Sequence, residues 1–174
     1  MADPPVRLRD ATLEDAELLD AWAADPAVRG VFNDFGTKPD RSYAEMLIGG
    51  PLRDENRGEM LVVRTADDVP IGTVGWHPAQ YGPVSSRAWN VGISLIPAAR
   101  GQGYGTVAQR LVADYLFATT DANRVEASTD VENRAEQRAL EKAGFIREGI
   151  LRGSQFRAGG YHDLISYARL RSDL

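Results

Sequence analysis

The residues most suited to chemistry form a glycine-rich segment, Arg100-Gly101-Gln102-Gly103-Tyr104-Gly105-Thr106. Glycine tolerates positive φ angles and lets a ligand approach the backbone, so successive N–H groups can point into one concavity. A helical pattern begins within the segment, and a helix N-terminus adds further unpaired N–H donors. These donors favour a phosphate or pyrophosphate, and the guanidinium of Arg100 can add a charge-assisted contact. The segment therefore predicts an anion-binding site.

Other uses of a glycine-rich loop fit this segment less well. A P-loop requires Gly-Lys-Ser/Thr after four spacers, and no lysine lies near these glycines. A dinucleotide-binding fingerprint follows the first strand of its unit, whereas four expected strands precede this loop. A structural turn between a strand and a helix does not need three glycines in five residues. The structural turn and a nucleotide site remain the alternatives to a phosphate-bearing cofactor.

Proton-transfer groups are scarce in this sequence. His77 and His162 are its only histidines, and it has no cysteine. Disulfides, thiolate metal sites and a cysteine nucleophile are therefore excluded, and we expect no metal centre. His77 is expected at the end of the third strand, where its imidazole would suit proton relay at neutral pH. A structural role at a strand end is the alternative for this histidine.

A mixed α/β pattern must position these residues. Alternating apolar residues predict strands over residues 6–9, 60–64, 71–76, 88–96, 124–129, 145–151 and 164–170. Helical spacing predicts helices after Thr12, over 42–48, from Gly103 onward and over 133–143, with a loop over 31–36. A loop around Gly153, Gly159 and Gly160 is expected between the last two strands. Hairpins combined with strand–helix–strand crossovers predict one mixed sheet covered by helices.

Length and composition indicate a single globular domain over residues 1–174. The chain has 43% apolar and 26% charged residues, as an ordinary folded protein does. Its net charge of −5 gives no general reason to bind nucleic acid or an anionic membrane. Residues 1–87 carry nine basic and fifteen acidic side chains, so this half suits a cationic ligand, and a solvated surface without a ligand is the alternative. No apolar run could span a membrane and residues 1–5 do not resemble a signal peptide, so we expect a cytoplasmic protein.

The glycine segment resembles the Arg/Gln-x-x-Gly-x-Gly/Ala signature of the GNAT superfamily of N-acetyltransferases. The segment from Asn133 to Phe145 is similar to a second motif of that superfamily, which runs from an asparagine to Lys-x-Gly-Phe. Gly149, Tyr161-His162-Asp163 and Tyr167 resemble the RimJ/RimL-like branch, which acetylates the N-termini of ribosomal proteins. The resemblance extends over essentially the whole chain. It implies a GNAT-like acyl-CoA acyltransferase fold, with a mostly antiparallel sheet of about seven strands and helices on both faces.

The resemblance also implies an activity and a cofactor site. The chain would move an acetyl group from acetyl-CoA to a primary amine, in a protein N-terminus or a small molecule, by direct attack. The N–H groups of Gly101, Gln102, Gly103, Tyr104, Gly105 and Thr106 would hold the CoA pyrophosphate, and Arg100 would assist them. The strand before the loop would diverge from its neighbour and pair with the pantetheine amides near Ile93 and Leu95. Asn133 would reach the pantetheine arm from the following helix.

The catalytic groups depart from the pattern of the superfamily. Asn90 stands where many members have a glutamate, and an amide cannot accept a proton at neutral pH. Leu140 stands where many members have a tyrosine, and Glu136 stands where RimJ/RimL-like members often have a serine. Glu136 and His77 are therefore the candidates for proton transfer, with Asn90 beside them in the site. Glu136 has an alternative role, because Asn133-x-x-Glu136 also has the spacing of a helix cap.

The loop over residues 31–36 is the expected wall of the acceptor cleft. Asp34 could pair with an ammonium group, Phe32 could form an apolar side, and Trp76 could line the cleft. Phe32 pinning the loop to the core and Trp76 packing in the sheet are the alternatives. His162 and Asp163 could close the cleft from a late strand. The expected partner is thus an amine, with neither nucleic acid nor membrane and with a homodimer left open.

A second class of function stays open because Asn90 and Leu140 replace proton-transfer residues. In that alternative the chain is a non-catalytic acyl-CoA-binding or interaction module on the same fold. Such a module would bind CoA without releasing thiol from acetyl-CoA.

Overall fold

The computed structural model describes residues 4–36, 40–83 and 86–173. Its strands are β1 (Val6–Arg9), β2 (Gly58–Arg64), β3 (Val69–Gln80), β4 (Arg87–Leu95), β5 (Arg124–Asp130), β6 (Ile146–Arg157) and β7 (Gly160–Leu170). Its helices are α1 (Ala16–Ala24), α2 (Pro26–Arg29), α3 (Tyr43–Ile48), α4 (Tyr104–Thr119) and α5 (Arg134–Lys142). The 3₁₀ turns are η1 (Leu13–Asp15), η3 (Pro97–Ala99) and η4 (Arg171–Asp173). All the strands and helices expected from the sequence are present, and α2 is an addition to them.

The strands form one seven-stranded sheet in the order β1-β2-β3-β4-β5-β7-β6. Neighbouring strands are antiparallel throughout, except that β4 and β5 run parallel. The connection between this parallel pair contains α4, because parallel strands need a long crossover. The predicted mixed, mostly antiparallel α/β sheet is therefore confirmed. Within the described residues, no helix combines the length and the apolar character that crossing a membrane would need.

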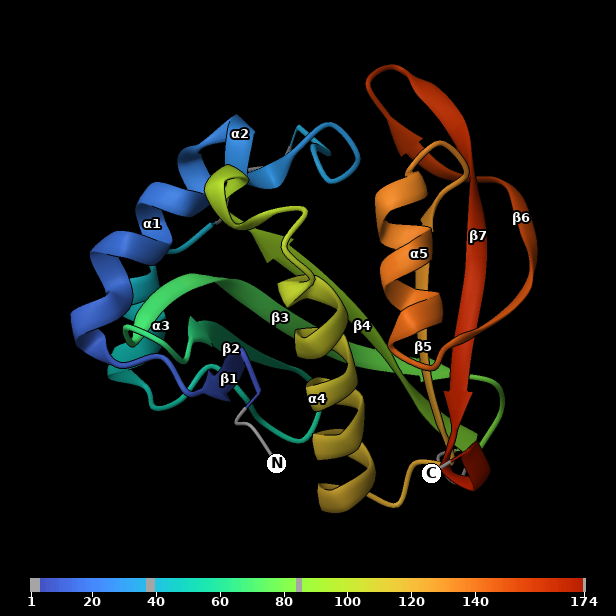
Figure 1. Ribbon diagram of the computed structural model, residues 1–174, viewed down its shortest axis with the longest axis horizontal. Coiled ribbons are helices and arrows are strands. Elements are labelled where there is room, and N and C mark those ends of the chain that lie inside the picture. The colour runs from blue at the N-terminus through green and yellow to red at the C-terminus, as the bar shows by residue number, and fades with distance from the viewer. Residues whose placement is uncertain (1–3, 37–39, 84–85, 174) are drawn as a thin grey trace.

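Helices cover both faces of the sheet (Figure 1). Successive residues of β2 point to opposite faces, so Val62 and Leu61 join different apolar clusters. Val62 packs in the larger cluster, which contains Leu116 of α4 and Leu140 of α5. Leu61 packs in the smaller cluster, with Leu19 of α1 and a buried leucine of α3. The α1–α3 face and the α4 face are therefore chemically separate sides of the same sheet.

Several strands are longer than the apolar pattern predicted, and β3, β6 and β7 exceed it most. β3 continues past Trp76 to Gln80, so His77 does not end the strand as expected. The predicted loop between the last two strands is also wrong, because β6 and β7 continue into it as a hairpin. Ala158 and Gly159 make the turn with φ angles of 49° and 82°. Most of β6 is exposed, and its pairing with β7 shifts register between Leu151 and Gln155. The sequence of β6 therefore lacks the alternation of apolar residues that predicts a strand.

The feature that positions the site is the divergence of β4 from β5. The two strands pair only at Trp89↔Val125 and Asn90↔Glu126. β4 continues to Leu95, and its residues beyond Asn90 have no partner on β5 in the described sheet. Figure 1 shows β4 and β5 separating from this junction, with α4 and α5 beside the gap. The sheet therefore opens along its only parallel pair, leaving one edge of β4 available to a ligand.

Candidate active site

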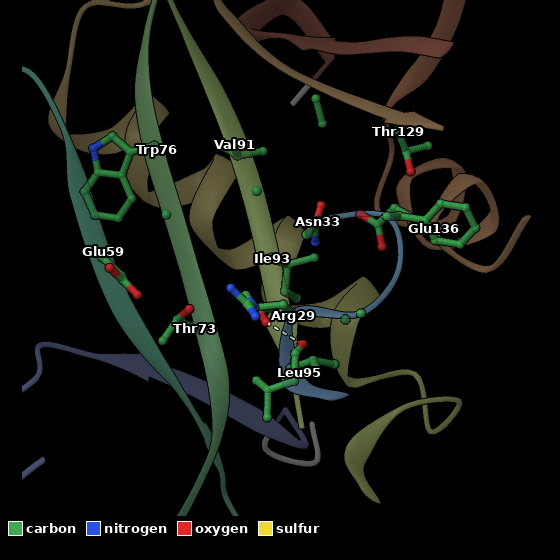
Figure 2. Close-up of a pocket in the computed structure, with 18 of the residues that line it drawn as sticks. Arg29, Asn33, Glu59, Thr73, Trp76, Val91, Ile93, Leu95, Thr129 and Glu136 are labelled. Atoms are coloured by element: carbon green, nitrogen blue, oxygen red, sulfur yellow. Dashed lines mark hydrogen bonds between the residues drawn. The ribbon is translucent and has the colours of Figure 1, made fainter. Parts of the chain in front are cut away.

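A large cleft of about 1470 Å³ follows the divergence of β4 and β5. Its walls come from α2 and the loop after it, from β2 to β4, from the glycine segment, from the end of β5 and from α5. Figure 2 shows Glu136 and Thr129 on one side of this cleft, and Ile93 and Leu95 of β4 on the other. Most of the predicted site residues, which lie far apart in the sequence, thus line one cavity.

The glycine segment adopts the conformation that an anion site needs. Gly101 and Gly103 have φ angles of 73° and 82°, in the left-handed region that favours glycine. Gly103 is the N-cap of α4, and the helical hydrogen-bond series begins with the N–H of Val107 donating to the Gly103 carbonyl at 3.3 Å. The N–H groups between them belong to the first helical turn, which has no internal acceptors. These donors at the cleft mouth fit a phosphate or pyrophosphate.

Gly105 lies where α4 meets the open part of β4. It lies in the first turn of α4, and a Cβ atom there would contact the side-chain ends of Ile93 and Leu95 at 3.8 and 3.7 Å. The helix therefore packs closely on the open part of β4. Both strand residues line the cleft, where their backbone has no partner on β5. An extended ligand with amide groups could pair with this edge as an added strand does.

Arg100 has a structural role beside its predicted one. Its Nε donates to the Leu95 carbonyl at 2.9 Å, and its Nη2 donates to the carbonyls of Ala27 and Val28 at 2.7 and 2.8 Å. The hydroxyl of Ser94 donates to the Val28 carbonyl as well, at 3.1 Å. These bonds fasten α2 to the start of the glycine segment. The contact of Arg100 with a pyrophosphate stays a prediction.

The side chains of Gln102 and Asn133 are both occupied by local hydrogen bonds. Gln102 donates from Nε2 to the carbonyl of Ala98 at 2.7 Å, so its predicted ligand contact rests on its backbone N–H. Asn133 is the N-cap of α5, and its Oδ1 accepts from the N–H of Glu136 at 3.3 Å. Asn133 nevertheless lines the cleft. Asn133 therefore orients the first turn of the helix that carries Glu136.

Glu136 does not complete a capping box, so the interpretation of its carboxylate as a helix cap is wrong. The N–H of Asn133, which such a cap would need, donates to the carbonyl of Asp130 at 2.9 Å. The carboxylate of Glu136 lies instead on the cleft wall (Figure 2). Burial raises the pKa of Glu136 from 4.5 to about 7. Its charged and neutral forms are thus both accessible near neutral pH, which suits proton transfer.

His77 and Asn90 are cross-strand partners on β3 and β4, and both line the cleft. His77 is exposed, and its Nδ1 lies 3.3 Å from the carbonyl oxygen of Pro78. Side chains alternate along each strand, so these two residues share a face with Gly75 and Gly92. Leu140, at the register of the family's tyrosine, is fully buried in the core. Within the described lining of the cleft there is no tyrosine.

The expected acceptor wall is present, but its charged residue is already paired. Asp34 lies 3.7 Å from a guanidinium nitrogen of Arg29, and it accepts from the N–H of Gly36 at 3.2 Å. Phe32 packs under the guanidinium of Arg157, 5.4 Å from its ring centroid. Trp76 lines the cleft, yet it is 94% buried and packs against the Tyr115 ring of α4. The sheet-packing interpretation of Trp76 is therefore the main one.

A buried ion pair supports this wall, and sequence reasoning missed it. Arg157 on β6 donates to Asp130 at the end of β5, and both side chains are almost inaccessible. Arg157 also donates to the Val31 carbonyl at 2.6 Å. The other Asp130 oxygen accepts from the N–H of Glu132 at 2.7 Å, in the turn before α5. His162 completes the cluster, with Nδ1 3.6 Å from Asp130. One ion pair thus holds both the acceptor loop and the turn that leads to Glu136.

Glu59 is a second cleft residue that sequence reasoning missed. It lies on β2, one residue before the strand was expected to begin, and its side chain faces the cleft beside Thr73 (Figure 2). The hydroxyl of Tyr43 on α3 donates to its two oxygens at 3.2 and 3.3 Å. Burial raises the pKa of Glu59, and the hydroxyls of Thr73 and Tyr43 oppose this by stabilising the carboxylate. A charged residue directly before an apolar strand was the available signal.

Among the described residues, no cluster of acidic, histidine or cysteine side chains has the arrangement of a metal site. The cleft therefore offers backbone donors, one partly buried carboxylate beside the split in the sheet, and a second carboxylate on β2.

Comparisons with known proteins point to one kind of protein. The family described as Acetyltransferase (GNAT) domain matches residues 6–146. The chain is 27% identical over 169 residues to an uncharacterized N-acetyltransferase, p20, of Bacillus licheniformis, covering 95% of this chain and 93% of p20. It is 25% identical over 174 residues to the putative ribosomal N-acetyltransferase YdaF of Bacillus subtilis, covering 96% and 86% of the two chains.

Among solved structures, the chain resembles a spermidine N-acetyltransferase from Vibrio cholerae in complex with CoA and spermine. The TM-score is 0.79 at 20% identity, and the match covers 98% of both chains. This likeness shows that the two proteins share a fold.

Proposed function

The chain belongs to the GNAT acetyltransferase family, in keeping with the RimJ/RimL-like branch, and on that premise we propose that it acetylates a primary amine from acetyl-CoA. The observation that carries the proposal is the position of the glycine segment beside the open edge of β4. A phosphate-binding backbone and an unpaired strand edge together match a ligand that has a pyrophosphate at one end and amides along its arm.

The residues of the cleft offer partners for each part of acetyl-CoA. The N–H groups of Gly101 to Thr106 would hold the pyrophosphate at the N-terminus of α4. The edge of β4 near Ile93 and Leu95 would pair with the pantetheine amides, and Asn133 lines the same channel. The thioester would then lie between β4 and the first turn of α5. The donor supplies an activated acetyl group at that point.

The chemistry is a direct transfer. The amine nitrogen attacks the thioester carbonyl carbon, the new C–N bond forms, and the C–S bond breaks. N–H groups of β4 beyond Asn90 would stabilise the negative charge that develops on the carbonyl oxygen. One proton must leave the nitrogen and one must reach the thiolate sulfur. Glu136, ionised, would accept the first and return it to the second, so the carboxylate ends as it began.

The acceptor would enter from the α1–α3 face of the sheet. His77, Asn90 and the two glycines beside them form the floor on that side, and the loop containing Phe32 and Asp34 forms a wall. A polyamine and a protein N-terminus, the substrates that the names of the spermidine and ribosomal enzymes imply for those proteins, are both candidate amines here. We propose that the reaction takes place in the cytoplasm. We also propose that residues 1–174 form a single domain.

Calorimetric titration with acetyl-CoA, CoA and ATP tests the donor site first. We expect saturable binding of both CoA species and none of ATP. A thiol-release assay with a panel of primary amines then separates an enzyme from a binding module. CoA binding without thiol release from any amine would support the non-catalytic alternative, and absence of CoA binding would overturn the proposal.

A further inference from the structure

A row of three residues crosses the sheet from β2 to the cleft. Glu59 pairs with Gly75 on β3, and Gly75 pairs with Gly92 on β4. Directly paired residues point to the same face of the sheet, so Glu59, Gly75 and Gly92 form a row on one face, and the two glycines have no side chain there. Gly92 lies two residues beyond Asn90, where β4 has already left β5. The row thus leads from the carboxylate of Glu59 to the proposed position of the reacting amine.

The two glycines keep this line clear. A Cβ atom added at Gly92 would meet nothing within 4 Å, and one at Gly75 would meet only the Gly58 carbonyl at 3.4 Å. The space above them is therefore open rather than filled by packing. Two strand spacings separate Glu59 from Gly92, about 10 Å between Cα atoms. Part of that distance is covered by the glutamate side chain, which leaves room for a short chain of atoms.

The carboxylate of Glu59 has no ion pair with a cationic side chain among the described residues. Its hydrogen-bond partners, Tyr43 and Thr73, are neutral. Three arginines that line the cleft each have a carboxylate partner: Arg29 with Asp34 at 3.7 Å, Arg53 with Asp10 at 2.7 Å and Arg57 with Asp54 at 4.0 Å. Arg41 also lines the cleft, and it donates to the carbonyl of Glu45 at 3.3 Å. No ion pair to Glu59 occurs among the described residues. A partly buried carboxylate in a cleft is stabilised by a cation that enters it.

We propose that Glu59 binds a second cationic group of the acceptor, so that the preferred substrates are amines carrying another ammonium or guanidinium group. This inference rests on the proposed function and specifies its substrate class. The reacting amine would lie over Gly92 beside the thioester, and the chain linking the two cations would cross Gly75. The choice of acceptor amine would then depend on an ion pair with Glu59, which lies two strands away from the reacting nitrogen. Glu59 itself would not exchange a proton with the reacting amine.

Paired substrates of equal length test the inference on the unmodified enzyme. Butylamine is compared with diaminobutane, and hexylamine with diaminohexane, by thiol release from acetyl-CoA. A hydrogen-bonded ion pair predicts a KM roughly 10- to 100-fold lower for the better diamine than for its monoamine. Equal KM values within each pair would overturn the inference while leaving the proposed function standing. No thiol release with any amine would overturn both.

Two variants locate the effect. Glu59→Gln should remove most of the diamine advantage through KM, with monoamine kinetics retained, and Glu17→Gln on the exposed surface of α1 is the matched control. Gly75→Val should also remove the advantage by filling the middle of the row, with Glu59 intact. This second variant keeps the test decisive if Glu59→Gln folds poorly. An equal fall in turnover of both substrate types in Glu59→Gln would overturn the inference, because Glu59 would then act on the reacting amine.

Discussion

The proposed donor end and the proposed acceptor end of the cleft are built in different ways. The donor end would use backbone N–H groups from one continuous segment, Gly101 to Thr106, in which the side chain of Gln102 donates to the carbonyl of Ala98 instead. The acceptor end uses side chains from strands and loops far apart in the sequence, such as Glu59, Phe32 and Arg157. The difference teaches that a phosphate site can be encoded locally, whereas the choice of amine depends on tertiary packing.

Glu136 lies between the two ends, and replacing it should have the largest effect on rate. Glu136→Gln keeps the size of the side chain and removes its ability to take a proton, so kcat should fall by about 10²- to 10⁴-fold. Because burial raises the pKa of Glu136 to about 7, wild-type activity should rise as the pH increases through that value. The variant should lose this rise. Steady-state rates across neutral pH measure both effects.

CoA affinity supplies the control for that variant. Titration of Glu136→Gln with CoA should give the wild-type dissociation constant, since the pyrophosphate site is made by the backbone of another element. A variant with full activity and an unchanged pH profile would show that Glu136 carries no proton in the reaction.

The same contrast decides how much could be predicted from the sequence. Glycines at Gly101 and Gly103 indicate a backbone conformation directly, and the structure gives both a positive φ angle, whereas anion binding there stays a prediction. The strands were predicted from alternating segments, whereas their order in the sheet was not. Glu59 was missed because a single charge beside an apolar strand does not reveal which side chains face it. Arg157 was missed because its segment is exposed and irregular, so the pattern indicated a loop.

Gly103→Val should have the next largest effect, on the donor end alone. A β-branched residue is strained at a φ angle of 82°, so the N–H groups of the loop would move from their present directions. We expect CoA to bind roughly 100-fold more weakly, as a strain of 1–3 kcal/mol and lost contacts imply. Calorimetry with CoA measures this change.

Gly159→Val is a matched control for that substitution. Gly159 has the same φ angle of 82°, and a Cβ atom there would meet nothing within 4 Å, but it lies in the turn between β6 and β7. Both variants strain the backbone, and only Gly103→Val should weaken CoA binding. Equal affinities in the two variants would remove the glycine segment from the donor site.

Breaking the buried ion pair should affect the acceptor end through the fold. Arg157→Met leaves Asp130 as a buried charge with one strong donor fewer, so the free energy of unfolding should fall by about 3–5 kcal/mol. The loop at Val31 loses a hydrogen bond as well, so the KM for the amine should rise more than the dissociation constant of CoA. Chemical denaturation and steady-state kinetics measure these changes.

Two further variants test whether the charge pair is responsible. Arg7→Met breaks the exposed ion pair with Asp68 and should cost only about 0–1 kcal/mol. Adding Asp130→Asn to Arg157→Met removes the uncompensated charge, so it should restore part of the lost stability. A double variant less stable than Arg157→Met would contradict the assignment of the cost to a buried charge.

The smallest expected effect is on thermal stability, and measuring it tests the burial of Glu136 in the absence of substrate. Burial raises the folded-state pKa from 4.5 to about 7, so between those values the folded protein holds a proton that the unfolded chain has released. The stability tied to that proton is complete at low pH and is lost as the pH rises through this window. Above it, the folded protein bears the full cost of a partly buried charge.

Glu136→Gln removes that cost. Its Tm should therefore exceed the wild-type Tm above neutral pH by roughly 2–4 °C for each kcal/mol of that cost, and the difference should shrink to a constant offset in acid. Scanning calorimetry of both proteins at several pH values measures the trend. A Tm difference that does not change with pH would mean that the Glu136 carboxylate is solvated like an ordinary surface group. The gap between β4 and β5 would then be hydrated where we propose the proton transfer. Glu136 would no longer be a suitable proton carrier, whereas the proposed backbone site for CoA would be unaffected.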